Sequence, residues 1–192
     1  MSKKVLIPLA EGCEELEAVT LIDLFRRANL DVTTASLTSE STVLCSRGTR
    51  LVADANLQSV IEDDGNKEGF DLIVLPGGLP GADNLNNDKR IHQLLSEATK
   101  AGQYIAAICA APRVLINNEN LVVKRMTAYP GALEHLDTSN IELSKEDIVK
   151  DGNIITAKGP GTAMDFALEL IEILLGKKAR KSVEEPLYRS SI

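Results

Sequence analysis

The sequence predicts an α/β fold in which a mostly parallel sheet is covered by helices on both faces. Short apolar runs alternate with segments of helical periodicity, as they do where helices connect buried parallel strands. The chain has 192 residues, which suits one domain over 1–192. Its 44% hydrophobic and 26% charged residues are ordinary for a globular protein that buries its core without disulfides or metals.

In the first half of the chain, the pattern predicts a strand over 5–9, a helix over 14–29 and a strand over 32–37. Residues 42–53 are typical of a hairpin or a pair of edge strands around Arg47-Gly48. A charged surface loop over 62–69 is too short to separate two domains. The next buried strand, over 70–75, ends in Pro76-Gly77-Gly78.

In the second half, we expect a helix over 88–100, a buried strand over 104–108 and a helix from 111 onward. Short strands over 126–129, 148–149 and 154–157 precede a strong helix over 161–175. Thr162 and Asp165 have the spacing of a capping box for this helix, and Gly176 follows its end. Residues 177–192 are polar and fit either a short helix or a loose tail.

Composition and charge narrow the function classes. The net charge of −7 argues against a large nucleic-acid surface, although a local basic pocket stays open. No apolar run is long enough to cross a membrane or to act as a secretory signal, so we expect a cytoplasmic protein. Three cysteines without paired spacing argue against a disulfide framework. Two histidines and no Cys-x-x-Cys give a zinc site little support.

Cys109 is the first candidate for chemistry. A buried strand passes into a helical pattern through Ile108-Cys109-Ala110, and small neighbours suit a tight turn. Ligands bind at the carboxyl ends of parallel strands, and a helix N-terminus favours a thiolate. A small buried core cysteine explains the position equally well. From position alone, the two interpretations are evenly matched.

Gly77 and Gly78 follow the neighbouring buried strand. Their backbone N–H groups can approach a ligand closely and form half of an oxyanion hole, with the Ala110 amide as the other half. For a lone Pro-Gly-Gly, however, an ordinary turn is the commoner explanation.

Glu17 is the most informative candidate. On a helical wheel it falls in line with Leu21, Leu24 and Ala28, which are core-facing positions. Burial would raise the pKa of its carboxyl, so that the group holds a proton at neutral pH and serves as a general acid or base. The alternative is an acid placed by the helix dipole, which suits Glu14 and Glu15 better than Glu17.

The remaining polar candidates have weaker support. Arg47 could bind an anion or cross a subunit boundary, although a solvated arginine is the commoner case. Arg27, at the end of the first predicted helix, suits the helix dipole. Cys13 and Cys45 are interpreted as structural or incidental, with Cys13 expected to be exposed and oxidisable near the helix start.

Taken together, these motifs resemble the ThiJ/PfpI superfamily, in particular its parkinsonism-associated deglycase branch and the bacterial YajL-like proteins. The resemblance extends over roughly 4–186, and the ordered set is far more specific than any one piece. Its pieces are Glu11-Gly12-Cys13-Glu14-Glu15-Leu16-Glu17-Ala18, Cys45-Ser46-Arg47, Leu75-Pro76-Gly77-Gly78, Ala106-Ala107-Ile108-Cys109-Ala110-Ala111-Pro112 and Gly159-Pro160-Gly161-Thr162.

The resemblance implies a flavodoxin-like three-layer sandwich, a homodimer and no cofactor or metal. It implies that Cys109 is an easily oxidised, low-pKa nucleophile with protonated Glu17 as its partner, and that the amides of Gly78 and Ala110 hold an oxyanion. It places the positions of Arg27 and Arg47 near the dimer interface and the site. The remaining substrate-binding candidates are Gly77, Tyr129, Gly159 and Pro160.

The activities implied by the family are deglycation of methylglyoxal- or glyoxal-modified amines and thiols, cofactor-free conversion of 2-oxoaldehydes to hydroxy acids, and redox-linked chaperone behaviour. One departure matters: Tyr129 stands before Pro130 where some members have a histidine. A tyrosine of ordinary pKa is a poor base, so efficient glyoxalase turnover is in doubt.

Three functions follow. The first is a Cys109- and Glu17-dependent deglycase or glyoxalase, and the alternative is a redox-responsive chaperone or sensor based on oxidation of Cys109. The third, a protease or amidotransferase, is weak because Ala110 follows the nucleophile and no histidine occurs over 159–165.

Overall fold

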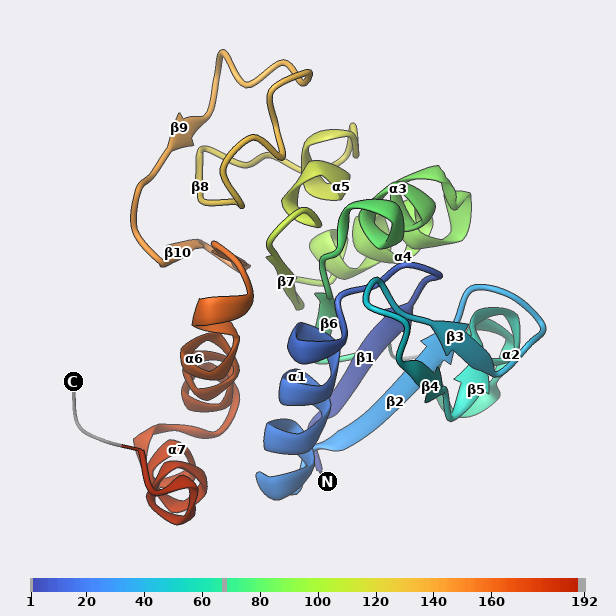
Figure 1. Cartoon of the computed structure of the whole chain (residues 1–192), viewed down its shortest axis with the longest axis vertical. Coiled ribbons are helices and arrows are strands. Elements are labelled where there is room, and N and C mark those ends of the chain that lie inside the picture. Colours follow the sequence, from blue (N-terminus) through green and yellow to red (C-terminus); the bar gives the residue numbers. More distant parts are fainter. Residues whose placement is uncertain (1, 67–68, 190–192) are drawn as a thin grey trace.

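A seven-stranded sheet forms the middle layer of the computed structural model, which describes residues 2–66 and 69–189 (Figure 1). Its strands are β1 (Lys4–Leu9), β2 (Asp31–Ser36), β5 (Ala55–Asn56), β6 (Leu72–Leu75), β7 (Tyr104–Ile108), β10 (Ile148–Asp151) and β11 (Ile154–Ala157). Their order is β10-β11-β7-β6-β1-β2-β5, and only β10 pairs antiparallel. The order β2-β1-β6-β7-β11 within it is that of flavodoxin-like folds.

Helices cover both faces of this sheet. On one face α1 (Glu15–Arg27) and α6 (Ala163–Leu175) stand side by side, and α7 (Lys177–Glu184) packs against α6 (Figure 1). The other face is covered by α2 (Leu57–Glu62), α4 (Lys89–Lys100) and α5 (Pro112–Ile116), with α3 (Leu79–Asn87) against α4 and α5. Within the described part of the chain, no helix combines the length and the apolar character needed to span a membrane.

The central strands are buried on both sides, which explains their continuous apolar sequences. In β1, Val5, Ile7 and Leu9 face the core on the α1 and α6 side, whereas Leu6 faces the opposite core. This alternation follows from the two-residue period of a strand. The structure therefore confirms the predicted α/β sandwich with a mostly parallel sheet.

Two small sheets lie outside the central one. The hairpin predicted over 42–53 forms as β3 (Thr42–Leu44) and β4 (Arg50–Val52). The other small sheet pairs β8 (Arg125–Met126) with β9 (Glu142–Leu143). Short 3₁₀ turns occupy Asp64–Asn66, Pro160–Thr162 and Glu185–Leu187.

Several predicted boundaries are wrong. The strand expected over 126–129 ends at Met126, because the Tyr129 N–H donates to the Cys109 carbonyl instead of a sheet partner. The capping box of Thr162 with Asp165 does not form, since the Thr162 hydroxyl donates to the Gly159 carbonyl over 2.8 Å. The helices α2 and α3 were not expected; α3 is hidden by Pro80 and Gly81 in its first turn.

Two surface predictions touch residues outside the described ranges. In the charged loop over 62–69, α2 continues to Glu62 and a 3₁₀ turn follows, while residues 67 and 68 lie outside the description. For the polar segment over 177–192, the helix alternative is correct over Lys177–Glu184, and residues 190–192 lie outside the description.

Candidate active site

Four strand ends meet at one edge of the sheet. Strand β7 leads into Cys109, and its parallel neighbours β11 and β6 lead into Gly159 and Gly77. The next strand, β1, leads into the loop over 10–14 that starts α1. The chain after β1 crosses to one face of the sheet, and the chain after β6 crosses to the other. Such a switch point is where open α/β sheets bind ligands.

Cys109 lies in a strained turn between β7 and α5. Its φ of 64° is in the left-handed region, which residues other than glycine seldom adopt. Its N–H donates to the Ala157 carbonyl and its carbonyl accepts from the Tyr129 N–H, each over 2.9 Å. Both neighbouring segments thus hold the turn, and the side chain is 8% exposed.

Glu17 is fully buried in the first turn of α1, on the same core face as Leu21 and Leu24. One carboxyl oxygen, Oε2, accepts the Gly77 N–H over 2.8 Å. The other, Oε1, is buried and has no hydrogen-bond partner within residues 2–66 and 69–189. The ordinary first-turn role belongs to Glu14, whose carboxylate accepts the Glu17 N–H over 2.8 Å.

Gly77 is the residue that lets the thiol and the carboxyl meet. A Cβ at this position would lie 2.6 Å from the Cys109 Cβ and 2.6 Å from Glu17 Oε2. It would also lie 2.8 Å from the Ile108 carbonyl oxygen. Any larger residue would therefore push the two candidate side chains apart.

Burial raises the pKa of Glu17 to about 7, against the Gly77 N–H and the Cys109 thiol, which lower it. Burial, and then the negative charge of Glu17, raises the pKa of Cys109 to about 12. A raised pKa of Cys109 is opposite to the low pKa that the resemblance implies for this thiol. The charge contribution disappears when Glu17 carries a proton, so a reactive thiolate requires a neutral Glu17.

Two backbone amides from separate turns act on the thiol. Hydrogen bonds from the Gly78 and Ala110 N–H groups lower the Cys109 pKa, against the burial that raises it. Gly78 has a φ of 86° at the start of α3, and a Cβ there would lie 2.4 Å from the Gly12 carbonyl oxygen. Because the loop is this tightly packed, the Gly78 amide is held in place.

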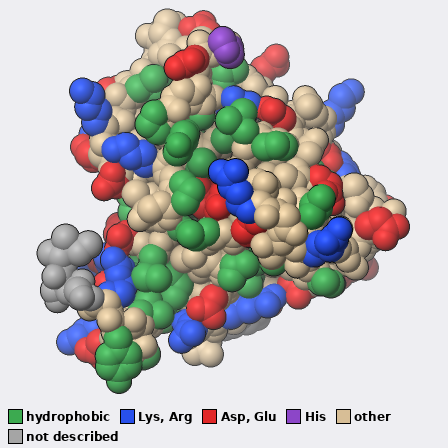
Figure 2. Space-filling model, in the orientation of Figure 1, with side chains coloured by type: hydrophobic (Ala, Val, Ile, Leu, Met, Phe, Trp, Pro, Cys, Tyr) green, Lys and Arg blue, Asp and Glu red, His purple; other side chains and the backbone are tan. Residues whose placement is uncertain are grey.

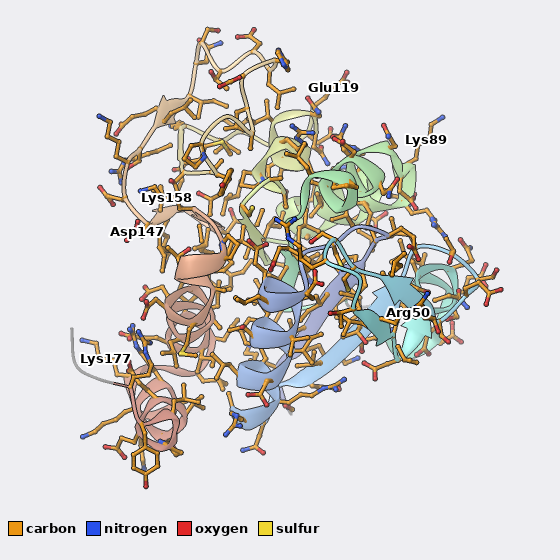
Figure 3. All side chains as sticks on the ribbon, viewed as in Figure 1. Arg50, Lys89, Glu119, Asp147, Lys158 and Lys177 are labelled. Carbon is orange, nitrogen blue, oxygen red and sulfur yellow. The ribbon has the colours of Figure 1, made fainter. Side chains whose placement is uncertain are left out.

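Tyr129, Gly159 and Pro160 lie on the β11 side of Cys109. A Cβ on Gly159 would be 3.1 Å from the Tyr129 ring, and that ring is half exposed. Lys158, just before Gly159, points toward Asp147 and pairs with it over 3.2 Å (Figure 3). The Tyr129 ring therefore lies against Gly159, while the Tyr129 backbone holds the Cys109 turn.

The two arginine candidates occupy different places. The backbone N–H of Arg47 donates to both carboxylate oxygens of Glu15, which fixes its loop beside the first turn of α1. Arg27 is in the last turn of α1, where it pairs with Asp23 over 2.7 Å. Ten residues of helix put Arg27 about 15 Å from Glu17, so one chain alone does not bring it to the site.

Cys13 and Cys45 are both buried, although Cys13 was expected to be exposed. Cys13 is fully buried and Cys45 is 4% exposed. The loop over 10–14 and the tip of the β3–β4 hairpin cover each other, which leaves Cys13 without solvent contact and Cys45 with little. The prediction that Cys13 is exposed is therefore wrong.

Arg113 is a positioning residue that the sequence did not reveal. It follows Pro112 in α5, forms an ion pair with Asp83 of α3 and donates to the Ala132 carbonyl over 2.7 Å. The Ala132 N–H in turn donates to the Tyr129 carbonyl. Arg113 thus connects the segment that carries Tyr129 to α3. The sequence did not indicate this role, because α3 itself was not expected.

Within the described ranges, no three His, Cys, Asp or Glu side chains gather closely enough to hold a metal ion. At the turns after β7 and β6, one thiol and one carboxyl are in contact with backbone amides. Such a site can carry out nucleophilic addition and proton transfer with its own groups.

The chain is similar to known proteins over nearly its whole length. Residues 3–173 match the model of the DJ-1/PfpI family. Protein dj-1beta of Drosophila melanogaster is 40% identical over 187 residues, which cover 97% of each chain. The crystal structure of Drosophila melanogaster DJ-1beta has a TM-score of 0.91 and 38% identity, with full coverage of both chains.

A third relative carries a name that states an activity. The glutathione-independent glyoxalase DJR-1.2 of Caenorhabditis elegans is 34% identical and matches 97% of this chain and 95% of its own length. The closer likeness to bacterial YajL-like proteins stays a prediction. The sandwich fold, the ordered motifs and these matches agree: the chain belongs to the DJ-1/PfpI family.

Proposed function

We propose that this protein is a cofactor-independent enzyme that uses Cys109 and Glu17 to convert 2-oxoaldehydes, such as methylglyoxal and glyoxal, to hydroxy acids. The observation that carries the proposal is the buried, unpartnered Oε1 of Glu17, within the described residues, next to a thiol at a strained turn. The relative named a glutathione-independent glyoxalase supports the reaction class.

In the first step, the Cys109 thiolate adds to the aldehyde carbon and forms a carbon–sulfur bond. The carbonyl electron pair moves onto oxygen, where the amides of Gly78 and Ala110 donate to it. The neutral carboxyl of Glu17 gives this oxygen its proton, which produces a hemithioacetal and leaves Glu17 as a carboxylate. A pKa near 7 suits a group that gives and takes a proton at neutral pH.

In the second step, the Glu17 carboxylate removes the hydrogen of the former aldehyde carbon as a proton and returns a proton to the neighbouring carbon. The hydroxyl proton of the former aldehyde carbon passes to the oxygen of the neighbouring carbon. The product is a thioester of a hydroxy acid on Cys109. Water then cleaves the thioester, so the net reaction adds one water to the 2-oxoaldehyde and restores the thiol. With an amine or thiol adduct as substrate, the Cys109 thiolate displaces the amine or thiol from the adduct carbon, and the repaired group leaves with a proton from Glu17. The same isomerisation and hydrolysis then release the hydroxy acid, which completes deglycation.

The decisive experiment compares the wild type with Cys109→Ser and Glu17→Gln on methylglyoxal in a buffer without amines. Loss of free aldehyde and loss of preformed adduct are followed separately. We expect both variants to lose at least about 100-fold in rate, as removal of a nucleophile or a general acid–base does. Full activity of Cys109→Ser would refute the proposal. If adduct loss never exceeds what aldehyde removal explains, only the direct deglycase activity is refuted.

A second candidate function, a redox-responsive chaperone or sensor, has one observation in its favour. The Gly78 and Ala110 amides that reach the thiol would also hold the oxygen of a sulfenic or sulfinic acid. Mass spectrometry after mild peroxide treatment tests this candidate. Oxidation of Cys13 or Cys45 with Cys109 unmodified would argue against it.

We also propose that the protein is a homodimer through the outer face of α1 and the β3–β4 hairpin. Leu16 and Val19 of α1 are 53% and 45% exposed, and Val52 of β4 is 73% exposed. A groove of about 280 Å³ lies between these elements and is lined in part by Val19, Leu51 and Val52. Figure 2 shows hydrophobic side chains over α1 on this face, with charged ones between them. Exposed apolar patches of this kind are typical of protein interfaces.

A further inference from the structure

The sulfur atoms of Cys13 and Cys45 lie 3.6 Å apart in the core beneath the start of α1. The two residues are separated by 32 positions in the chain and come from different segments, the loop before α1 and the turn directly after β3. Neither thiol has a part in the proposed reaction at Cys109. Two cysteines this close are a potential redox pair rather than two independent core residues.

Backbone hydrogen bonds hold the pair from both sides. The Gly12 N–H donates to the Leu44 carbonyl over 2.7 Å, and the Ser46 N–H donates to the Cys13 carbonyl over 2.8 Å. Chain segments joined in this way lie about 5 Å apart. Disulfides span Cα separations of about 4.4–6.8 Å, so the frame already has the spacing of a cross-link.

We propose that Cys13 and Cys45 form a reversible intrachain disulfide, which is a second redox site separate from Cys109. The sulfur atoms are 3.6 Å apart and need to approach by roughly 1.5 Å to reach the bond length of a disulfide. Rotation of the two short side chains supplies most of such a movement, and the flanking hydrogen bonds remain in place.

The oxidant that we assign is a low-molecular-weight disulfide, such as glutathione disulfide. Cys45, the less buried thiol, loses its proton and attacks one sulfur of the small disulfide, which releases one thiolate. Cys13 then loses its proton and attacks the Cys45 sulfur, and the second thiolate leaves. Two electrons pass to the small disulfide, and the two protons from the cysteines end on the two released thiols.

The cross-link would join the loop that positions the proposed site to the hairpin. In that loop, the Glu14 N–H donates to the Gly77 carbonyl over 2.9 Å, and a Cβ on Gly81 would lie 2.7 Å from the Cys13 Cα. A disulfide that closes this long a stretch restricts the unfolded chain. We expect it to raise the Tm of the protein by about 5–10 °C.

The test uses the full chain, incubated with glutathione disulfide and then alkylated and digested with trypsin. The three cysteines fall in separate peptides, 5–26, 28–47 and 101–113. We expect peptides 5–26 and 28–47 to be joined with a mass about 2 Da below their sum, and a dithiol to separate them again. The wild type alone decides the outcome, so the test does not depend on a variant that folds.

Variants add a matched control. Cys109→Ser leaves the cross-link and the rise in Tm unchanged, whereas Cys13→Ser and Cys45→Ser abolish both. The proposal is overturned if Cys13 and Cys45 are both recovered alkylated while Cys109 is modified. It is equally overturned if glutathione remains on Cys45 as a stable mixed disulfide, or if the cross-link joins Cys109 to either residue.

Discussion

Gly77 donates its backbone N–H to Glu17 Oε2 over 2.8 Å, and the absence of a side chain on the same residue leaves the space in which the carboxyl and the Cys109 thiol meet. One residue thus fixes the carboxyl and determines its distance from the thiol. The turn at the end of β6 is therefore part of the proposed site and not merely a connection.

Gly77→Ala is expected to destabilise the protein by about 1–3 kcal/mol, because the new Cβ overlaps Cys109, Glu17 and the Ile108 carbonyl. The rate of methylglyoxal conversion should fall together with the stability. Urea denaturation and an aldehyde assay measure the two effects. Gly161→Ala is the matched control: a Cβ there meets nothing within 4 Å, so stability should change by no more than about 1 kcal/mol. Equal effects of the two changes would contradict this account.

Glu17→Gln should alter how stability depends on pH. The pKa of Glu17 is raised by burial to about 7, above its value of about 4.3 in the unfolded chain, so the folded state holds this proton more tightly. Its contribution to stability is complete below about pH 4.3 and is lost as the pH rises through 7. Relative to the glutamine variant, the wild type should lose about 3 kcal/mol between pH 4 and pH 8.

Glu15→Gln is the control for this titration. Burial acts to raise the pKa of Glu15, but hydrogen bonds from its own N–H, the Arg47 N–H and the Ser46 hydroxyl lower it overall. Its contribution is therefore present at neutral pH and lost on acidification, which is the opposite sign. Denaturant titrations at several pH values measure both variants, and the same sign for both would contradict the assigned pKa shifts.

Cys109→Gly should be more stable than Cys109→Ala by about 1 kcal/mol. The φ of 64° is strained for any residue with a Cβ and is free of strain for glycine. Both variants lack the thiol and should be inactive, so the difference in stability between them reports the backbone strain alone. Thermal and urea unfolding measure the difference, and an alanine variant that is at least as stable as the glycine variant would show that the turn is unstrained.

Tyr129→His tests the departure from those relatives that carry a histidine before the proline. Tyr129 is half exposed beside Gly159, so a histidine should fit without loss of stability. An added proton acceptor should raise kcat for methylglyoxal by about tenfold. This gain is smaller than the contribution of about 10²–10⁴-fold that general base catalysis usually makes. Tyr129→Phe is the control and should leave kcat within about twofold. A tenfold loss in Tyr129→Phe would show instead that the hydroxyl binds substrate.

Val52→Asp should shift the protein from dimer to monomer if the proposed interface is correct. Val52 is the most exposed apolar residue of the patch at 73%, and a charge there would be buried against the partner. Analytical ultracentrifugation over a range of concentrations measures the change. Val122→Asp, on an equally exposed valine outside the patch, is the control. Equal dimer content in wild type and Val52→Asp would place the interface elsewhere.

Much of the fold could be predicted from sequence because the central strands are buried on both faces and therefore form continuous apolar runs. The burial of Glu17 could also be predicted, since its helix keeps a regular apolar stripe with Leu21 and Leu24. Helix α3 could not, because Pro80 and Gly81 in its first turn are typical of a loop.

Other parts of the site depend on long-range packing that no local pattern records. The pKa of Cys109 depends on the charge of Glu17 and on amides from two separate turns. The contact between Cys13 and Cys45 depends on how a hairpin folds over the start of α1. Arg113 was missed for the same reason, since its partner Asp83 lies on the helix that was not foreseen.

The hydrogen bond from Cys109 to Ala157 has a consequence for biosynthesis. During translation the thiol leaves the ribosome well before β11, the strand that completes its turn. Until that strand pairs with β7, the Cys109 N–H lacks its acceptor and the turn lacks its full burial, so we expect the thiol to react like that of a free cysteine. We therefore expect a period during synthesis in which Cys109 is open to alkylation and oxidation. The rate at which Cys109 becomes protected from alkylation would report when β11, the last parallel strand, docks.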